Sequence, residues 1–268
     1  MHDLVSVESF DVEKTYEYIL SIQVSLNGFS FCIKTPEENR ILASKAIPLS
    51  ISSNSVINHH FSEWVKTEAL LHRPYKKIRM IVSGDFFTMI PEDYYDESQK
   101  KPITAFLFQR NHNFEIAENV IHSLKSKLLF TLPPGLNHTI QNEIGECEIA
   151  HPVKLIINNL PEIQKEYGLV LFLDVNNFYA VLFSQNTVLL ANNFEMAHAN
   201  DLVYFVLTIL KQNALSINQT TIFLTSVFKQ GNGFTEHLIS VFPEIIFLDA
   251  EDDFNGNVQV IQFAHRCM

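Results

Sequence analysis

The sequence predicts an α/β protein in which two halves repeat one plan of three strands, a helix and a fourth strand. Two tight turns carry this prediction, Asn27-Gly28 and Asn176-Asn177, because each ends an apolar strand and opens a return strand. In both halves an apolar stripe at helical spacing follows the third strand. With 47% hydrophobic residues and 22 Phe, the chain can build a large core. The repeated order indicates an internal duplication.

The first half is predicted to open with a strand over residues 16–25, in which apolar and other residues alternate at period two. After the Asn27-Gly28 turn, the chain is predicted to return over residues 29–34. A polar turn then leads into a third strand over residues 40–48. These three strands should form an antiparallel meander with one strongly apolar face.

A helix is predicted to begin near residues 53–55 and to end before Pro74, because apolar residues recur there at helical spacing. A strand follows over residues 76–83 (KKIRMIVS). Lys100-Lys101-Pro102 is expected to lead into a further strand over residues 103–109. Since a helix crosses over after the meander, the fourth strand should lie parallel to the first.

The second half repeats this order. Its long helix is predicted to be capped by Asn200, and Gly231-Asn232-Gly233 is predicted to open a short helix. The predicted elements are strands over residues 169–175, 178–184 and 187–193, the helix after Asn200, a strand over 220–225, the short helix to Val241 and a strand over 244–248.

We place the division between the halves at residues 115 and 116. Residues 1–115 form the first half with an acidic N-terminal tail, and residues 116–268 hold a connecting segment and then the second half. The connecting segment, residues 115–165, is predicted to contain a hairpin followed by a helix after His151-Pro152.

The composition narrows the range of partners and compartments. Formal net charge at pH 7 is −11, from 19 Lys and Arg against 30 Asp and Glu, so we expect no nucleic-acid partner. Cys32, Cys147 and Cys267 are far apart, which excludes a disulfide framework or a paired-cysteine metal site. No apolar run approaches the ~20 residues of a membrane span, and the acidic N-terminus does not match a secretory signal. We therefore expect a soluble, cytoplasmic protein.

The doubled plan resembles the actin-like ATPase fold, the duplicated ribonuclease-H-like architecture of actins, Hsp70-type chaperones and sugar kinases. Three stretches are similar to a bacterial family of unknown function whose members are thought to have this fold. They are residues 20–31 (LSIQVSLNGFSF), 189–194 (LLANNF) and 201–204 (DLVY). The resemblance implies two ribonuclease-H-like halves with mixed sheets flanked by helices.

In active members of that fold, nucleotide lies between the two halves. The first turn of each half cradles phosphates with backbone N–H groups, which favours glycine, and an Asp on each leading strand holds Mg²⁺. In this chain Ser25 occupies the first Asp position, whereas Asp174 occupies the second. The turn residues are Asn27 and Gly28 in the first half and Asn176 and Asn177 in the second.

A third glycine-rich turn would follow the fourth strand of the second half, but Thr225 and Ser226 stand there. The whole chain has only 8 Gly, which is a small share for its length. We also expect the bulky Phe29 and Phe178, beside the two leading turns, to crowd a triphosphate.

Each candidate site has a plain structural alternative. We interpret Asn27-Gly28 as a hairpin turn in preference to a phosphate-binding turn. Asp174 is interpreted as a strand-end residue that satisfies backbone N–H groups, and as a metal ligand only if nucleotide binds. Gly231 and Gly233 would hold an anion at a helix N-terminus, although a flexible helix entry explains them as well. Tyr94-Tyr95, flanked by carboxylates, is either a docking loop or an ordinary surface loop.

We therefore predict a non-catalytic protein of this fold that binds a partner protein of unknown identity through a surface still to be found. Its nucleotide cleft is predicted to be degenerate, so we expect no cofactor. The rival hypothesis is an ATP-binding enzyme or ATP-gated assembly factor that binds Mg-ATP. It would use Asp174 together with Ser25, Gly28 and Gly231.

Overall fold

The chain divides into two compact units, Met1–Lys154 and Leu155–Met268, each with its own mixed sheet. The division predicted between residues 115 and 116 falls inside the first of these units. The computed structural model describes residues 4–7, 9–37, 40–84, 86–108, 114–163, 165–174, 176–185, 187–226 and 233–248.

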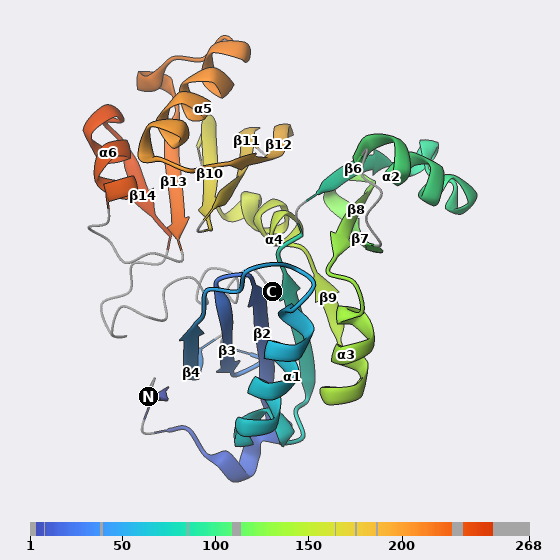
Figure 1. Ribbon diagram of the computed structural model, residues 1–268. Helices are drawn as coiled ribbons and strands as arrows, with labels where there is room; N and C mark the ends of the chain where they lie inside the picture. The colour runs from blue at the N-terminus through green and yellow to red at the C-terminus, as the bar shows by residue number, and fades with distance from the viewer. Residues whose placement is uncertain are drawn as a thin grey trace. The chain divides into compact units, whose positions relative to one another are not determined.

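The main sheet of the first unit has the strand order β1-β4-β3-β2-β5-β9 over the described residues (Figure 1). Strands β2, β3 and β4 form the predicted antiparallel meander, and β5 lies parallel to β2, as expected for a helix crossover. Strand β9 pairs in parallel with β5. The strands are β1 (Val5–Ser6), β2 (Ile19–Ser25), β3 (Gly28–Lys34), β4 (Ile41–Pro48), β5 (Lys77–Val82) and β9 (Glu148–Ala150).

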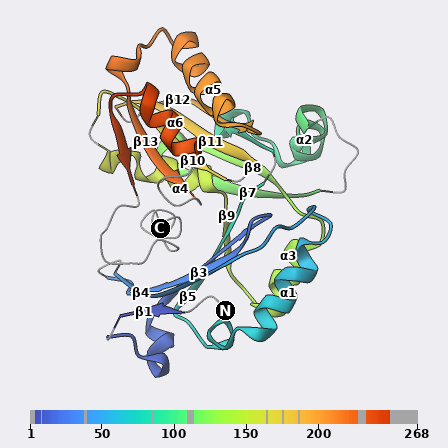
Figure 2. The ribbon, with the colours of Figure 1, turned by 60° about the vertical axis from the view of Figure 1, so that its left-hand side comes forward.

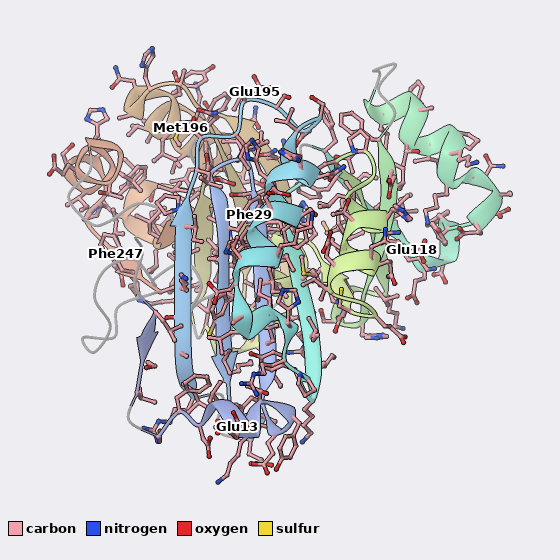
Figure 3. All side chains as sticks on the ribbon, turned by 60° about the horizontal axis from the view of Figure 1, so that its bottom comes forward. Glu13, Phe29, Glu118, Glu195, Met196 and Phe247 are labelled. Carbon is pink, nitrogen blue, oxygen red and sulfur yellow. The ribbon has the colours of Figure 1, made fainter. Side chains whose placement is uncertain are left out.

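Helix α1 (Ile57–Thr67) covers the apolar face of this sheet (Figures 2 and 3). The ring of Phe29 stacks on Trp64 at 5.2 Å between centroids and meets Phe61 edge-on at 5.6 Å. Helix α3 (Leu136–Glu143) packs beside α1 (Figure 2). In the first strand, Val24 pairs with Phe29 and Ile22 pairs with Phe31, so its alternating apolar side chains face the helix layer, as predicted.

Between β5 and β9 the chain builds a three-stranded sheet with the order β6-β8-β7, next to helix α2. Strands β7 and β8 are the hairpin predicted in the connecting segment, and the left-handed residue Lys125 (φ 45°) lies in its turn. The bounds are β6 (Phe87–Pro91), α2 (Lys100–Phe108), β7 (Glu115–Ile121) and β8 (Ser126–Leu132).

The prediction of a strand over residues 103–109 is wrong, because the chain is helical from Lys100 to Phe108. The hydroxyl of Thr104 donates to the carbonyls of Lys100 at 2.8 Å and Lys101 at 3.1 Å, which a helical turn brings within reach. The apolar run ITAFLF has a strand-like composition, and short runs of this kind do not separate helix from strand. Pro102 is tolerated because it lies in the first helical turn, where N–H groups have no helical acceptor.

The sheet of the second unit has the order β12-β11-β10-β13-β14 over the described residues. It repeats the first unit's plan, since β10, β11 and β12 form a meander and β13 lies parallel to β10. Helices α5 and α6 pack on one face of it around Leu171, Leu173 and Leu224. The bounds are α4 (Pro152–Asn159), β10 (Tyr167–Leu173), β11 (Asn177–Ser184), β12 (Thr187–Glu195), α5 (Ala199–Gln212), β13 (Thr221–Ser226), α6 (Gly233–Val241) and β14 (Ile245–Phe247).

The cap of α5 differs from the prediction, because His198 rather than Asn200 is the capping residue. One carboxylate oxygen of Asp201 accepts the backbone N–H groups of His198 at 2.8 Å and Ala197 at 2.9 Å. These backbone hydrogen bonds lower the pKa of Asp201. An acidic residue three positions into the helix therefore decides where α5 begins.

Short 3-10 helices complete the described structure. They are η1 (Val12–Glu17), η2 (Ala69–His72), η3 (Glu92–Tyr94), η4 (Glu97–Gln99), η5 (His122–Leu124), η6 (Leu160–Glu162) and η7 (Ile217–Gln219). Within the described ranges, every helix is too short or too polar to cross a lipid bilayer.

Candidate functional site

The first leading turn differs by one position from the prediction. Ser25 pairs with Gly28, so Leu26 and Asn27 form the loop and Gly28 is the first residue of β3. The backbone N–H of Asn27 donates to the hydroxyl of Ser25 at 3.2 Å. This N–H group, which a phosphate would need, therefore has an acceptor within the turn itself.

Gly28 is required by packing. Its φ of +123° is strained for any other residue, and a Cβ added there would lie 2.1 Å from the carbonyl oxygen of Ile47. The same Cβ would lie 2.8 Å from the backbone nitrogen of Leu49. Leu49 N–H also donates to the carbonyl of Asn27 at 2.9 Å. The close approach of the chain after β4 thus explains this glycine without any ligand.

The second leading turn is closed by backbone hydrogen bonds. The N–H of Asp174 donates to the carbonyl of Asn177 at 2.8 Å, and the N–H of Met196 donates to the carbonyl of Asn176 at 2.7 Å. The side chain of Asp174 is buried, with 5% of its surface exposed. The carboxylate at the end of β10 is therefore buried and not on the surface of the protein.

Asp174, Asn177 and Thr225 lie on the same face of the second sheet. Phe172 pairs with Thr225 on one side and with Tyr179 on the other, so these three residues share a face. Alternate residues along a strand share a face, so Asp174, two residues after Phe172, and Asn177, two residues before Tyr179, lie on it as well. This face is opposite the one that α5 and α6 cover. The amide oxygen of Asn177 and the hydroxyl of Thr225 are buried, and neither finds a hydrogen-bond partner among the described residues. These side chains bring together three kinds of oxygen: carboxylate, amide and hydroxyl.

Oxygen ligands of this kind suit a hard cation such as Mg²⁺. The residues equivalent to the phosphate turns fit a nucleotide poorly, because the N–H groups of Asn27 and Asp174 are engaged within their turns. Ser25 adds no charge to bind a cation. Over the parts of the chain that are described, no three His, Cys, Asp or Glu side chains gather as a metal site.

The remaining predicted site residues lie at or beyond the end of β13. Ser226 is the last residue of that strand and pairs with Leu173. Gly233 is the first residue of α6. Gly231 lies outside the described residues, so the anion site at this helix stays a prediction.

The expected crowding of the turns by two aromatic rings is not found. Phe29 lies against α1, as described above, and Phe178 stacks on Phe194 at 5.2 Å between centroids. Phe178 is also 6.2 Å from Phe205 of α5. Both rings belong to the cores under their helices, because strand alternation directs them there.

Sequence reasoning missed a charged network on the three-stranded sheet, centred on Glu118 (Figure 3). Glu118 accepts hydrogen bonds from Tyr95 at 2.7 Å, Lys100 at 2.9 Å and Lys127 at 3.0 Å. The Lys127 ammonium also lies 4.3 Å from the centre of the Tyr95 ring. Tyr95 and Lys100 lie on either side of η4, whereas Glu118 and Lys127 belong to β7 and β8, so only the fold brings the four together.

The comparisons agree with this architecture. A protein of unknown function with an actin-like ATPase fold, from Bacteroides thetaiotaomicron VPI-5482, matches with a TM-score of 0.77 and 19% identity, over 94% of this chain and 98% of that one. The PilM–PilN type IV pilus biogenesis complex contains a chain with a TM-score of 0.55 and 10% identity, over 93% of this chain and 98% of that one.

The ethanolamine utilization protein EutJ from Carboxydothermus hydrogenoformans matches with a TM-score of 0.52 and 7% identity, over 92% of this chain and 89% of its own. At these identities the likeness establishes the fold alone. The predicted actin-like ATPase fold is thereby confirmed. No curated protein matches the sequence. Residues 7–243 match a family of unknown function, DUF3822, and the chain belongs to that family.

Proposed function

We propose that this protein is a non-catalytic member of the actin-like ATPase fold that acts by binding a partner protein. The observation that carries the proposal is the first leading turn. Gly28, the residue there that most resembles a phosphate-binding feature, is explained by its contacts with Ile47 and Leu49. Gly28 is buried, whereas the loop residues Leu26 and Asn27 are half-buried.

Phosphate binding by a turn needs several backbone N–H groups that point away from the protein toward the ligand. The Asn27 N–H is engaged by Ser25, and the Asp174 N–H is engaged by Asn177. Catalysis of phosphoryl transfer also needs charge that balances the developing charge on phosphate, usually through carboxylate-held metal ions. Ser25 supplies no such charge, so one half of the expected metal-binding pair is missing.

Partner binding is the activity that the fold supports without a nucleotide. One neighbour of this fold occurs in the PilM–PilN complex, which is an assembly of that protein with another protein. This is an analogy between folds at 10% identity, and it supports a class of function rather than a partner.

The second candidate function is ATP binding by an enzyme or an assembly factor. One specific observation favours it, namely the buried carboxylate of Asp174 beside the unpartnered oxygens of Asn177 and Thr225 in the described structure. Buried polar atoms without partners are uncommon and are often explained by a missing water, ion or ligand.

Nucleotide titration followed by thermal unfolding separates the two candidates. At ~1 mM Mg-ATP, a micromolar dissociation constant would stabilise the protein by roughly 4 kcal/mol. We expect no such stabilisation with Mg-ATP or Mg-ADP. The matched variants are Asp174→Asn, which removes the buried carboxylate, and Glu195→Gln, which removes an exposed carboxylate at the residue that pairs with Asn177. A stabilisation that disappears in Asp174→Asn and persists in Glu195→Gln would refute the proposal.

A further inference from the structure

The most exposed large apolar side chains in the described structure belong to the segment that runs from η3 into α2. Tyr94 is 81% exposed and Phe106 is 75% exposed, and Leu107 beside it is 47% exposed. Exposed apolar side chains that gather in one segment, as Tyr94, Phe106 and Leu107 do, are candidates for binding, whereas single exposed ones are common on protein surfaces. The segment lies in the part of the chain that is inserted between β5 and β9 (Figure 1).

Helix α2 exposes apolar side chains to solvent and buries a polar one, which is the reverse of an ordinary surface helix. Its polar Thr104 is buried, with 5% of its surface exposed, whereas Phe106 and Leu107 face solvent. An ordinary surface helix turns its apolar stripe toward the core. The apolar side of α2 is therefore available to a partner.

The approach to α2 is held rigidly on the three-stranded sheet. The Tyr95 hydroxyl lies 2.7 Å from a carboxylate oxygen of Glu118 of β7 and 2.6 Å from one of Glu97, and the Lys100 ammonium donates to Glu118 at 2.9 Å. Asp96 accepts the N–H of Ser98 at 2.8 Å and fixes the start of η4. Because Tyr95 is anchored inward, the neighbouring Tyr94 is presented outward before any partner arrives, which reduces the entropy lost on binding.

The same segment carries a run of acidic side chains at its surface. Glu92, Asp93, Asp96 and Glu97 are all exposed, within six consecutive residues. Lys100 is paired with Glu118 and lies 3.6 Å from Glu97. The exposed Lys101 and Lys125 lie at the two ends of the segment, so its acidic surface charge is carried mainly by Glu92, Asp93 and Asp96 between them. An acidic rim beside exposed aromatic and aliphatic side chains is complementary to a surface that is both basic and apolar.

We propose that η3, η4 and α2 form a docking surface for a partner protein that offers a basic, amphipathic helix. Lysine and arginine of that helix would meet Glu92, Asp93 and Asp96, and its apolar side would cover Tyr94, Phe106 and Leu107. Nucleic acids and anionic membranes would be repelled by the same carboxylates. This inference rests on the proposed function, because it assigns the partner-binding site and the chemistry of the partner.

The test uses the full chain and a fluorescein-labelled helical peptide of leucine and lysine, followed by fluorescence anisotropy. A peptide of the same pattern with glutamate in place of lysine is the charge control. We expect the lysine peptide to bind and the glutamate peptide to bind at least about tenfold more weakly, with the difference shrinking as salt rises. Equal binding of the two peptides, or no binding of either, would overturn the proposal.

Substitutions locate the site. Phe106→Ser and Asp93→Asn should each weaken the lysine peptide, the former by at least about tenfold, since buried aromatic anchors dominate binding energy. Tyr204→Ser is the matched control, because Tyr204 is a 64% exposed ring on α5, outside the proposed surface. Equal weakening by Phe106→Ser and Tyr204→Ser would show a nonspecific apolar contact and refute the site. The nucleotide titration is independent of this experiment, so failure of the docking surface and failure of the proposed function are distinguishable.

Discussion

Acidification should destabilise the first unit through one buried histidine, His151. The backbone N–H of His151 donates to the side-chain oxygen of Asn119 at 2.9 Å, and the ring nitrogen Nδ1 of His151 accepts the backbone N–H of Val153 at 3.3 Å. The rings of Phe87 and Phe130 lie 5.0 and 5.1 Å from the imidazole, centre to centre. His151 thus caps the first turn of α4 from inside an aromatic cage.

Burial is the main reason that the pKa of His151 is lowered to about 3, against an opposing hydrogen bond with the Gly84 backbone. The ordinary pKa of a histidine side chain, which applies to the unfolded chain, is 6.5. The folded state therefore favours the neutral ring, and its stability is fully present above pH ~6.5 and declines as pH falls toward ~3. Protonation would also place a hydrogen on Nδ1, where the Val153 N–H already points.

The magnitude follows from these two pKa values. Between about pH 7.5 and about pH 5, the unfolded state gains a proton that the folded state excludes, and the free energy of unfolding falls by about 2 kcal/mol. The carboxylates contribute little over this interval, because their unfolded pKa values lie near or below ~4.5. The change in the free energy of unfolding over this pH interval therefore reports mainly on histidine.

Urea unfolding at the two pH values measures the effect. Trp64 is the sole tryptophan of the chain and lies in the first unit with His151, so its fluorescence reports the relevant transition. The variant His151→Asn keeps a capping side chain but does not titrate, and all other histidines are unchanged. We expect wild type to lose about 2 kcal/mol more than the variant. The same pH dependence in both proteins would refute this role of His151.

Three further substitutions test the packing of the two leading turns by urea unfolding. Gly28→Ala should destabilise by about 3 kcal/mol or more, whereas Gly145→Ala, also at positive φ (+92°) but with no atom within 4 Å of the new Cβ, should lose only about 1 kcal/mol. Equal losses would contradict the packing explanation of Gly28. Thr225→Val should be neutral or stabilising, because it removes a buried hydroxyl that has no partner among the described residues; a loss above about 1 kcal/mol would reveal a partner. Phe29→Ala should destabilise by about 3–5 kcal/mol through loss of its stack on Trp64, and a loss below about 1 kcal/mol would contradict that contact.

The repeated meander could be predicted because its signals are local. Alternation at period two, the Asn-Gly turn and the helical stripe each depend on neighbouring residues, and strand pairing and the parallel fourth strand follow from chain connectivity. The predicted cap of α5 failed at Asn200, because Asp201 binds the N–H groups of Ala197 and His198 from within the helix. Helix starts are decided by such single contacts.

The segment that became α2 shows where pattern reasoning fails. Its six residues ITAFLF are too few to reveal a period, and their composition favours a strand. The hydrogen bonds of Thr104 and the links from Lys100 and Tyr95 to Glu118 hold the segment as a helix on the three-stranded sheet. The exposure of Phe106 follows from that placement and has no signature in the sequence.

The sequence by itself determined the doubled α/β plan, the hairpin turns between antiparallel strands and the absence of an Asp at the first leading position, where Ser25 stands. Only the tertiary structure decided what the turn residues do. Gly28 is needed because the end of β4 passes within contact distance, and Asn177 and Thr225 share a face with Asp174 because strand register places them there. Such contacts join residues far apart in the chain, and their geometry depends on packing rather than on any local pattern.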